Sequence, residues 1–216
     1  MRRPSQQYAS LVAEKNRDTT AITTGRNGAR SLASDISTST TWSSSGLDET
    51  HNEAVAGRRS KLYSRYTNPT VRQFETAIAE LEGAEDALAF GSGMGALASV
   101  VFALCSPGDH IVAQQQLYGG TIAFLNGPVR RMGINVTFVD ATIPGAFTAA
   151  AKTPRTMLVI AETPANPALA LADLAELGAI AIPFTVVDST FATPMSQQPL
   201  AHGVNLSLHS ATKGIG

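Results

Sequence analysis

Six residues in the second half of the 216-residue chain carry groups that can bind ions, share protons or form covalent bonds. They comprise two carboxylates, one amide, two hydroxyls and one amine: Glu162, Asn166, Asp188, Ser210, Thr212 and Lys213. A lysine amine can condense with an aldehyde, a carboxylate can hold a cation or a proton, and hydroxyls can bind phosphate. If the fold brings them together, this set predicts a cofactor or substrate site.

Short apolar segments precede these residues and are predicted to be strands. They alternate with helical segments, and the strands are His110–Ala113, Asn135–Val139, Thr156–Ala161, Phe184–Val187 and Leu206–Leu208. Such alternation is typical of an α/β fold, a mostly parallel sheet with helices on both faces. Ligands of open parallel sheets bind beyond the carboxyl ends of the strands, so we expect the polar residues there to converge.

Each of these residues also has an ordinary structural explanation. Asp188 can begin a turn, Asn166 before Pro167 is a common turn pair, and a lysine such as Lys213 is usually solvated. Three polar clusters at three strand ends of one sheet are harder to explain in this way. Their combination favours a functional site.

The helices expected around these strands are Val71–Leu81, Gly93–Leu104, Gly120–Pro128, Thr148–Ala151 and Leu171–Leu177. Thr70 is predicted to cap the first of them and Gly83 to end it. The apolar residues on one face of that helix are Phe74, Ile78 and Leu81. Residues 1–60 are polar and suit an extended arm better than a core-forming unit.

The segment Gly91–Ala96 matches the G-x-G-x-x-A fingerprint of dinucleotide-binding folds. That fingerprint requires an acidic residue at the end of the following strand, where Gln114, Gln115 and Gln116 stand instead. Asp109 precedes the strand, so a dinucleotide site is not supported. Small residues that open a helix still present backbone N–H groups to an anion, which favours a phosphate.

The segment Ser210–Lys213 fits the S-x-x-K pattern of penicillin-recognising serine enzymes. Those enzymes also carry Ser-Asp-Asn and Lys-Thr-Gly motifs, neither of which occurs here, although a continuation of the chain could supply them. The sequence stops in a predicted loop directly after an apolar strand. We therefore expect it to be a fragment of a longer domain.

The bulk composition argues for a packed, soluble protein. Hydrophobic residues make up 44% of the chain and charged residues 15%, and the net charge of −1 gives no footprint for nucleic acid or an anionic membrane. The single cysteine, Cys105, is expected to be buried and inert, and it allows neither a disulfide framework nor a metal site. No apolar stretch follows Arg2 and Arg3, and none could span a membrane, so we expect a cytoplasmic location.

Six sequence motifs recur in the order in which one enzyme family carries them. They are Tyr63–Thr70, Ser92–Met94, Tyr118–Thr121, Glu162–Pro167, Val187–Thr190 and Ser210–Lys213. In these motifs the chain resembles the Cys/Met-metabolism pyridoxal-phosphate enzymes: cystathionine γ-synthase, the cystathionine lyases, methionine γ-lyase and the homoserine-ester sulfhydrylases. The resemblance covers essentially the whole chain, since Thr20–Trp42 also looks like the family's N-terminal arm.

The resemblance implies the α/β fold of type I pyridoxal-phosphate transferases, like the major domain of aspartate aminotransferase. Residues 1–65 would form an arm between subunits. Residues 66–216 would form the cofactor-binding major domain, cut short at its C-terminal end and without the C-terminal domain. The cofactor implied is pyridoxal 5'-phosphate and the substrate a small amino acid.

The resemblance also implies a role for each motif residue. Lys213 would form the Schiff base and, once freed by substrate, move protons. Asp188 would keep the pyridine nitrogen protonated, Tyr118 would stack on the ring and act in catalysis, and Asn166 would bind the ring 3-oxygen. The other cofactor contacts implied within this chain are Ser92, Gly93, Met94, Glu162, Thr190, Ser210 and Thr212.

Tyr63 and Arg65 are implied to act on a neighbouring subunit. In the family, residues at these positions reach the phosphate and the substrate across the dimer, and the planar fork of arginine suits phosphate oxygens. Tyr63 is therefore also expected to be catalytic. The assembly implied is a closed homo-oligomer, a tetramer built from two dimers.

The reaction itself stays open among three alternatives. The first is γ-replacement or γ-elimination on an activated homoserine, and the second is a lyase that breaks cystathionine, homocysteine or methionine. Gly120 stands where methionine γ-lyases often have cysteine, which argues mildly against that activity, and Gly214 stands where many members have tyrosine. The third is an inactive fragment that binds only cofactor or subunits, because the arginine for the substrate carboxylate lies in the family's missing C-terminal half.

Overall fold

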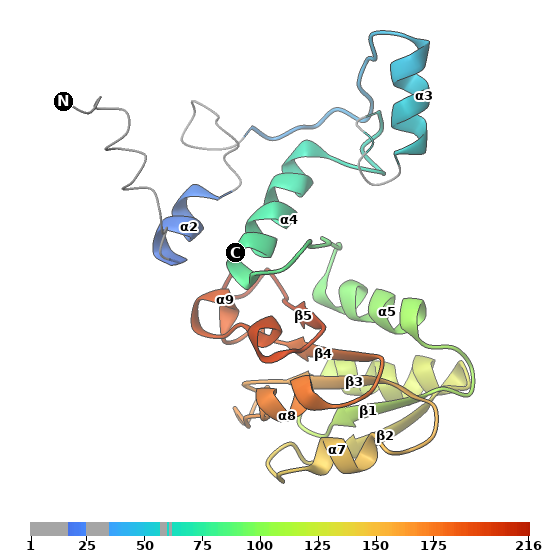
Figure 1. Ribbon diagram of the computed structural model, residues 1–216, viewed down its shortest axis with the longest axis vertical. Coiled ribbons are helices and arrows are strands. Elements are labelled where there is room, and N and C mark those ends of the chain that lie inside the picture. Colours follow the sequence, from blue (N-terminus) through green and yellow to red (C-terminus); the bar gives the residue numbers. More distant parts are fainter. Residues whose placement is uncertain (1–16, 25–34, 57–59, 61) are drawn as a thin grey trace, which may run out of the picture. The chain divides into compact units, whose positions relative to one another are not determined.

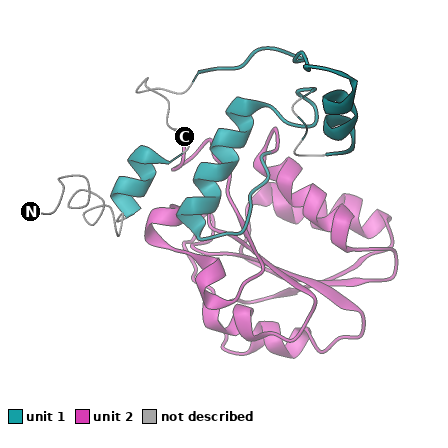
Figure 2. Ribbon diagram, turned by 45° about the horizontal axis from the view of Figure 1, so that its top comes forward, with its two compact units in different colours: residues 1–89 teal, residues 90–216 magenta. Residues whose placement is uncertain are grey.

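The computed structural model describes residues 17–24, 35–56, 60 and 62–216. The chain divides into two compact units, residues 1–89 and residues 90–216, which are coloured separately in Figure 2. The predicted arm, residues 1–65, falls within the first unit, and parts of it (1–16, 25–34, 57–59 and 61) lie outside the described residues. The arm boundary at residue 65 stays a prediction.

Unit 2 is built on a five-stranded sheet in the order β2-β1-β3-β4-β5 (Figure 1). In chain order the strands are β1 (His110–Gln114), β2 (Asn135–Val139), β3 (Thr156–Glu162), β4 (Phe184–Asp188) and β5 (Leu206–Leu208). All four neighbouring pairs run parallel, which confirms the predicted fold class. The carboxyl ends of the strands therefore meet along one edge of the sheet.

Three strands extend one residue further at this edge than predicted. Gln114, Glu162 and Asp188 continue the ladder, with Gln114 paired to Val139 and Glu162 paired to Asp188. A polar side chain does not end a strand when its backbone still finds a partner, and Gln114 and Glu162 are buried. Two of the predicted site residues are therefore fixed by the sheet itself.

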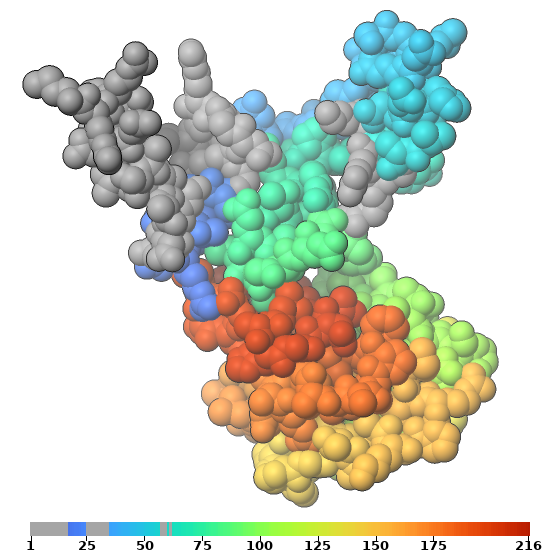
Figure 3. Space-filling view, in the orientation of Figure 1, coloured from blue at the N-terminus to red at the C-terminus, as the bar shows by residue number. Residues whose placement is uncertain are grey.

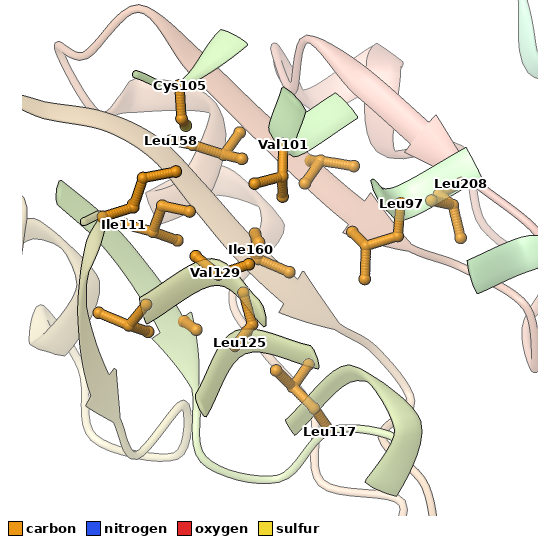
Figure 4. Close-up of a cluster of buried hydrophobic side chains, with 14 residues drawn as sticks. Leu97, Val101, Cys105, Ile111, Leu117, Leu125, Val129, Leu158, Ile160 and Leu208 are labelled. Atoms are coloured by element: carbon orange, nitrogen blue, oxygen red, sulfur yellow. The ribbon is translucent and has the colours of Figure 1, made fainter. Parts of the chain in front are cut away.

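Two apolar layers cover the sheet, because successive strand residues point to opposite faces. On one face, Leu97 and Val101 of α5 (Gly93–Leu104) pack with strand residues such as Ile160 (Figure 4). On the other face, Phe147 and Leu177 pack with a second set: Val112, Val159, Ala161 and Val187. Helices on both faces bury all of β1 and all but one residue of β3, as the continuous apolar segments predict, whereas the edge strands β2 and β5 are more open.

The shorter helices of unit 2 begin and end at slightly different residues from those predicted. They are α6 (Gly119–Phe124), η3 (Leu125–Val129), α7 (Ala146–Ala150), α8 (Leu174–Ala179), α9 (Thr193–Ser196) and η4 (Pro199–His202). The predicted Gly120–Pro128 helix is α-helical only as far as Phe124 and continues as the π-helical turn η3. This turn contains Pro128, which has no backbone N–H to donate. The predicted Leu171–Leu177 helix starts later because Asp173 caps it, accepting from the N–H groups of Ala175 and Glu176 at 2.8 and 3.2 Å.

Unit 1 contains α2 (Arg17–Thr23), α3 (Leu47–Val55) and α4 (Pro69–Glu82). The prediction that Thr70 caps α4 is wrong, because Asn68 caps it and accepts from the N–H groups of Thr70 and Val71. Pro69 takes the first helical position, where its missing N–H costs nothing. Gly83, in the left-handed region at φ 67°, ends the helix as predicted.

The predicted apolar face of α4 is not its most buried face. Phe74 is exposed, whereas Glu75, Ala79 and Glu82 are buried. Glu75 lies 3.1 Å from the Arg72 guanidinium and accepts a bond from the N–H of Ala89 at 2.9 Å, so its burial is compensated. Apolar spacing alone could not reveal that contact.

Within the described part of the chain, no helix is long and apolar enough to cross a membrane.

His110, at the start of β1, ties three strands together and should make stability depend on pH. Its Nδ1 lies 2.8 Å from Thr156 Oγ1, which donates to the Thr153 carbonyl, so Thr156 accepts from Nδ1–H and Thr137 Oγ1 donates to Nε2 at 2.8 Å. This arrangement suits the neutral ring, and burial lowers the pKa of His110.

A histidine whose pKa is lowered by folding favours the folded state above its unfolded pKa of about 6.5. We therefore expect the free energy of unfolding, measured in urea, to fall as the pH drops below about 6.5. The fall should be smaller in His110→Gln, because the glutamine amide can still form hydrogen bonds but does not titrate. An equal pH dependence in the two proteins would assign the effect to other groups.

Candidate active site

The predicted site residues of unit 2 gather at the carboxyl edge of the sheet. Glu162 ends β3, Asp188 ends β4, and the turn that follows β5 carries Lys213 (Figure 1). Glu162 pairs in register with Asp188, and Asp188 pairs in register with Leu208. The convergence expected from the topology is therefore present. In the space-filling view, the orange and red atoms of this C-terminal part of unit 2 form one continuous surface (Figure 3).

Helix α5 begins beside the turn that contains Lys213. Ser92 caps the helix, and its Oγ accepts from the N–H of Gly95 at 3.0 Å. A Cβ on Gly93 would lie 3.1 Å from the Cβ of Ser210, so the absence of a side chain lets the two segments approach. The first turn of a helix leaves N–H groups without helical partners and attracts anions, and a phosphate bound by Gly93 and Met94 stays a prediction.

The turn after β5 brings one amine and two hydroxyls together. Lys213 Nζ lies 3.3 Å from both Ser210 Oγ and Thr212 Oγ1, and the two hydroxyl oxygens are 3.4 Å apart. Next to the start of α5, these groups can hold a phosphate through hydroxyl donors and the helix N-terminus. The side chain of Met94 faces the core, where its Sδ accepts from Thr121 Oγ1 at 3.8 Å.

Asp188 is held by Thr190, two residues further along the chain. Its Oδ1 accepts from the N–H of Thr190 at 3.0 Å and from Thr190 Oγ1 at 2.5 Å, while Thr190 Oγ1 accepts from the N–H of Ser210 at 2.8 Å. Burial raises the pKa of Asp188, although the bonds from Thr190 and the charges of His209 and Lys213 oppose the rise. A partly buried carboxylate of this kind gains from a cationic partner.

Glu162 is 5% exposed and accepts two backbone bonds. Its Oε2 accepts from the N–H of Tyr118 at 2.6 Å and its Oε1 from the N–H of Asn166 at 2.9 Å. Burial raises its pKa, which these two bonds lower and the charge of Asp188 raises. Sequence reasoning placed Glu162 at a strand end of the sheet but did not anticipate these partners. Its predicted contact with a cofactor stays a prediction.

Tyr118 precedes α6, and its side chain is half-exposed. A Cβ on Gly120 would lie 2.4 Å from the Tyr118 ring, so the ring occupies the space that a side chain at position 120 would need. Asn166 lies after β3 in a loop where both the Thr163-Pro164 and the Asn166-Pro167 peptide bonds are cis. Its backbone N–H donates to Glu162 Oε1 at 2.9 Å, which places Asn166 beside the end of β3.

A narrow cavity lies beneath this edge, on the face of the sheet that α5 and α6 cover. Eight residues line it: Leu97, Leu117, Thr121, Ile160, Glu162, Val186, Asp188 and Leu208. Two carboxylates thus face the same space, at the end of an otherwise mostly apolar wall. A tyrosine ring, two carboxylates, an amine and an anion-binding turn along this edge are the groups that a flat cationic ring with a phosphate and an aldehyde would need.

Tyr63 and Arg65 belong to unit 1 and form a cluster of their own. The Arg65 guanidinium carbon lies 4.7 Å from the centre of the Tyr63 ring, and the rings of Tyr63 and Tyr66 meet edge to face at 6.1 Å. A cation over an aromatic face is a favourable pair that leaves the guanidinium N–H groups available. Their action at a neighbouring subunit's site stays a prediction.

The residues considered for a dinucleotide site have structural partners. Asp109 accepts from the N–H of Ser106 at 2.7 Å and from the Arg155 guanidinium at 2.8 and 3.1 Å, which lowers its pKa. Gln114 is fully buried, and its Oε1 accepts from the N–H of Glu162 at 3.1 Å. Sequence reasoning missed this support of Glu162, although a glutamine ending a buried strand was its signal.

Cys105 is buried, and burial raises the pKa of its thiol to about 11, as expected for an inert cysteine. Among the described residues, no group of three or more His, Cys, Asp or Glu side chains could hold a metal ion.

Comparison with known families gives one match over residues 18–216, to the model described as Cys/Met metabolism PLP-dependent enzyme. The chain is 46% identical over 157 residues to an O-succinylhomoserine sulfhydrylase of Pseudomonas aeruginosa, covering 71% of this chain and 39% of that one. It is 38% identical over 193 residues to an L-methionine gamma-lyase of Treponema denticola, covering 87% and 48%. The chain thus spans about half the length of the curated relatives it matches.

Two solved structures share the fold. A crystal structure of metB from Corynebacterium glutamicum superposes with a TM-score of 0.82 at 35% identity, covering 92% of this chain and 51% of that one. A putative O-acetylhomoserine (thiol)-lyase from Campylobacter jejuni superposes with a TM-score of 0.85 at 28% identity, covering 93% and 50%. The latter was solved with N'-pyridoxyl-lysine-5'-monophosphate, a lysine joined to the cofactor.

Proposed function

We propose, from the membership of this chain in the Cys/Met metabolism PLP-dependent enzymes, that the protein performs γ-replacement on an activated homoserine. Similarity to a protein named O-succinylhomoserine sulfhydrylase supports a homoserine ester as the substrate class. Similarity to proteins named L-methionine gamma-lyase supports a second candidate, a lyase acting on methionine. The packing of Tyr118 against Gly120 favours the first, because a cysteine at position 120 would displace that ring.

One observation carries the proposal: the amine of Lys213 lies 3.3 Å from two hydroxyls, in a turn that Gly93 allows to approach the start of α5. An amine beside an anion-binding turn is the arrangement needed to bind a phosphorylated aldehyde covalently. Pyridoxal phosphate, when bound, supplies an electron-accepting ring that stabilises negative charge at the substrate Cα.

The residues of this chain would then have distinct roles. Ser210 and Thr212 would hold the phosphate, and Asp188 would hold the proton of the pyridine nitrogen. Tyr118 would pack on the ring face. Lys213, which is exposed on a short turn, would take a proton from the substrate Cα and then one from Cβ, the carbon next to the one that bears the leaving group.

The two candidate reactions differ in their need for a thiol. Purified chain, and any longer protein that contains this sequence, would be loaded with pyridoxal phosphate and given O-succinylhomoserine with or without cysteine. Thioether product that forms only with cysteine is the expected result. Sustained release of α-keto acid from methionine, given without thiol in a parallel assay, would instead assign a lyase. Cofactor binding without turnover in the chain, beside turnover in the longer protein, would assign the chain a binding role alone.

A cytoplasmic location and a tetramer built from two dimers belong to the same proposal. Tyr63 and Arg65 support the assembly, because Arg65 is exposed beside the half-buried Tyr63 ring and its guanidinium suits contact with a phosphate on a neighbouring subunit. Light scattering of the cofactor-loaded protein measures the assembly directly. A monomer of full activity would contradict the role proposed for these two residues.

A further inference from the structure

Glu162 connects two chain segments that are far apart in sequence. Its Oε2 accepts from the N–H of Tyr118, which precedes α6, and its Oε1 accepts from the N–H of Asn166, in the loop after β3. Each carboxylate oxygen thus holds one backbone group. The side chain spans the gap between the residue expected on the ring face and the residue expected at the ring 3-oxygen.

The carboxylate is itself rigidly placed. Glu162 is the last residue of β3, where its backbone pairs with β4, and its N–H donates to Gln114 Oε1 at 3.1 Å. With the side chain 5% exposed, water does not compete for these bonds. A fixed acceptor in a dry place can set the positions of the groups that donate to it.

We propose that Glu162 is a positioning residue, which holds Tyr118 and Asn166 at a fixed separation across the cofactor ring through their backbone N–H groups. The inference rests on the proposed function only in naming the cofactor. It assigns Glu162 no direct contact with that cofactor. Its action passes through the two residues that it holds.

Glutamine at position 162 is the sharpest substitution. It keeps the length of the side chain but turns one of the two acceptors into an NH₂ group, which would face a backbone N–H and leave it without a partner. Either Tyr118 or Asn166 should then move. Cofactor binding would then have to restore the position of the residue that moved, so we expect it to weaken by roughly tenfold to a hundredfold.

Unit 2 supplies a matched control in Glu176. Its Oε2 accepts from the N–H of Gly145 at 3.1 Å and its Oε1 from the N–H of Thr148 at 2.9 Å, so it also joins two backbone groups. Glu176 lies on α8, whose Leu177 packs on the opposite face of the sheet from the cavity. Glu176→Gln removes the same kind of contact away from the site.

The experiment compares the purified wild-type chain, Glu162→Gln and Glu176→Gln in two measurements. One is the dissociation constant for pyridoxal phosphate. The other is the visible circular dichroism of the bound cofactor at saturation, which reports how the ring is held. We expect Glu162→Gln to raise the dissociation constant roughly tenfold or more and to weaken the dichroism per bound cofactor. Glu176→Gln should match wild type in both.

The outcomes separate the inference from the function on which it rests. A wild-type chain that binds no pyridoxal phosphate would overturn the proposed function. A wild-type chain that binds it, with Glu162→Gln equal to wild type in affinity and dichroism, would overturn the positioning role alone. The same holds if Glu176→Gln changes both as much as Glu162→Gln does.

A measurement on wild type covers the case in which Glu162→Gln does not fold. The Tyr118 side chain is 49% exposed, so its backbone N–H should exchange slowly with deuterium only because Glu162 holds it. We expect slow exchange at Tyr118 and Asn166 in the cofactor-free protein. Exchange as fast as in an open loop at both positions would overturn the inference.

Discussion

Lys213→Ala is expected to abolish covalent attachment of pyridoxal phosphate to this chain. Only an amine can form the imine with the cofactor aldehyde, and no hydroxyl in the turn after β5 can replace it. Reduction with borohydride makes such a link permanent, so the mass of the intact protein measures it. Wild type should gain the mass of one reduced cofactor, and Lys213→Ala should gain none. Turnover, where the protein shows it, should fall by a factor on the order of a thousand or more.

Lys152→Ala is the matched control for this experiment. Lys152 is exposed and lies just beyond α7, outside the carboxyl edge of β3, β4 and β5. It should keep the mass gain of wild type. A mass gain in both variants would mean that surface lysines react without selection. A mass gain in Lys213→Ala but not in Lys152→Ala would mean that the covalent site is not Lys213.

The sheet could be predicted because its signal is local. Five continuous apolar segments gave five strands, and β2 and β5 have the predicted bounds. Parallel topology then follows from the alternation with helices, and the convergence of Asp188 and Lys213 follows from the topology. The strand ends at Glu162 and Asp188 were missed by one residue because backbone pairing, and not side-chain polarity, ends a strand.

The contacts between distant segments could not be predicted from the sequence. Nothing near Glu162 indicates that it accepts from Tyr118, 44 residues earlier in the chain. The cap of α4 was misassigned for a different reason, since Asn68 and Thr70 are both good capping residues and only the helix start at Pro69 decides between them. Asp188 shows the same limit, because its neighbours in sequence suggest a turn while its burial depends on the whole sheet.

Asp188→Asn is expected to weaken binding of pyridoxal phosphate while stabilising the cofactor-free protein. Burial raises the pKa of Asp188, so folding favours its protonated form. The stability that this group contributes is therefore present below the unfolded pKa of about 3.9 and is lost as the pH rises through the folded pKa. Asparagine stays neutral and can still accept from Thr190, so the free energy of unfolding at neutral pH should rise by roughly 0.5–2 kcal/mol.

The loss of affinity should be much larger, because the bound cofactor presents a protonated nitrogen that only a carboxylate can neutralise. Removing one partner of a buried charge pair costs about 2–5 kcal/mol, or roughly 30- to 5,000-fold in the dissociation constant. Urea unfolding of the cofactor-free protein and titration with pyridoxal phosphate measure the two effects separately.

Asp140 provides the control, since it forms the same turn at the end of another strand. Its Oδ1 accepts from the N–H and the hydroxyl of Thr142 at 2.9 and 2.7 Å, as that of Asp188 does from Thr190. These bonds lower the pKa of Asp140, so its stabilising effect is present above the unfolded pKa and Asp140→Asn should lose stability at neutral pH. A gain of stability in Asp188→Asn and a loss in Asp140→Asn, with affinity lost only in Asp188→Asn, would identify Asp188 as a carboxylate that serves binding although it destabilises the folded protein. Equal changes in the two variants would reduce it to an ordinary turn residue.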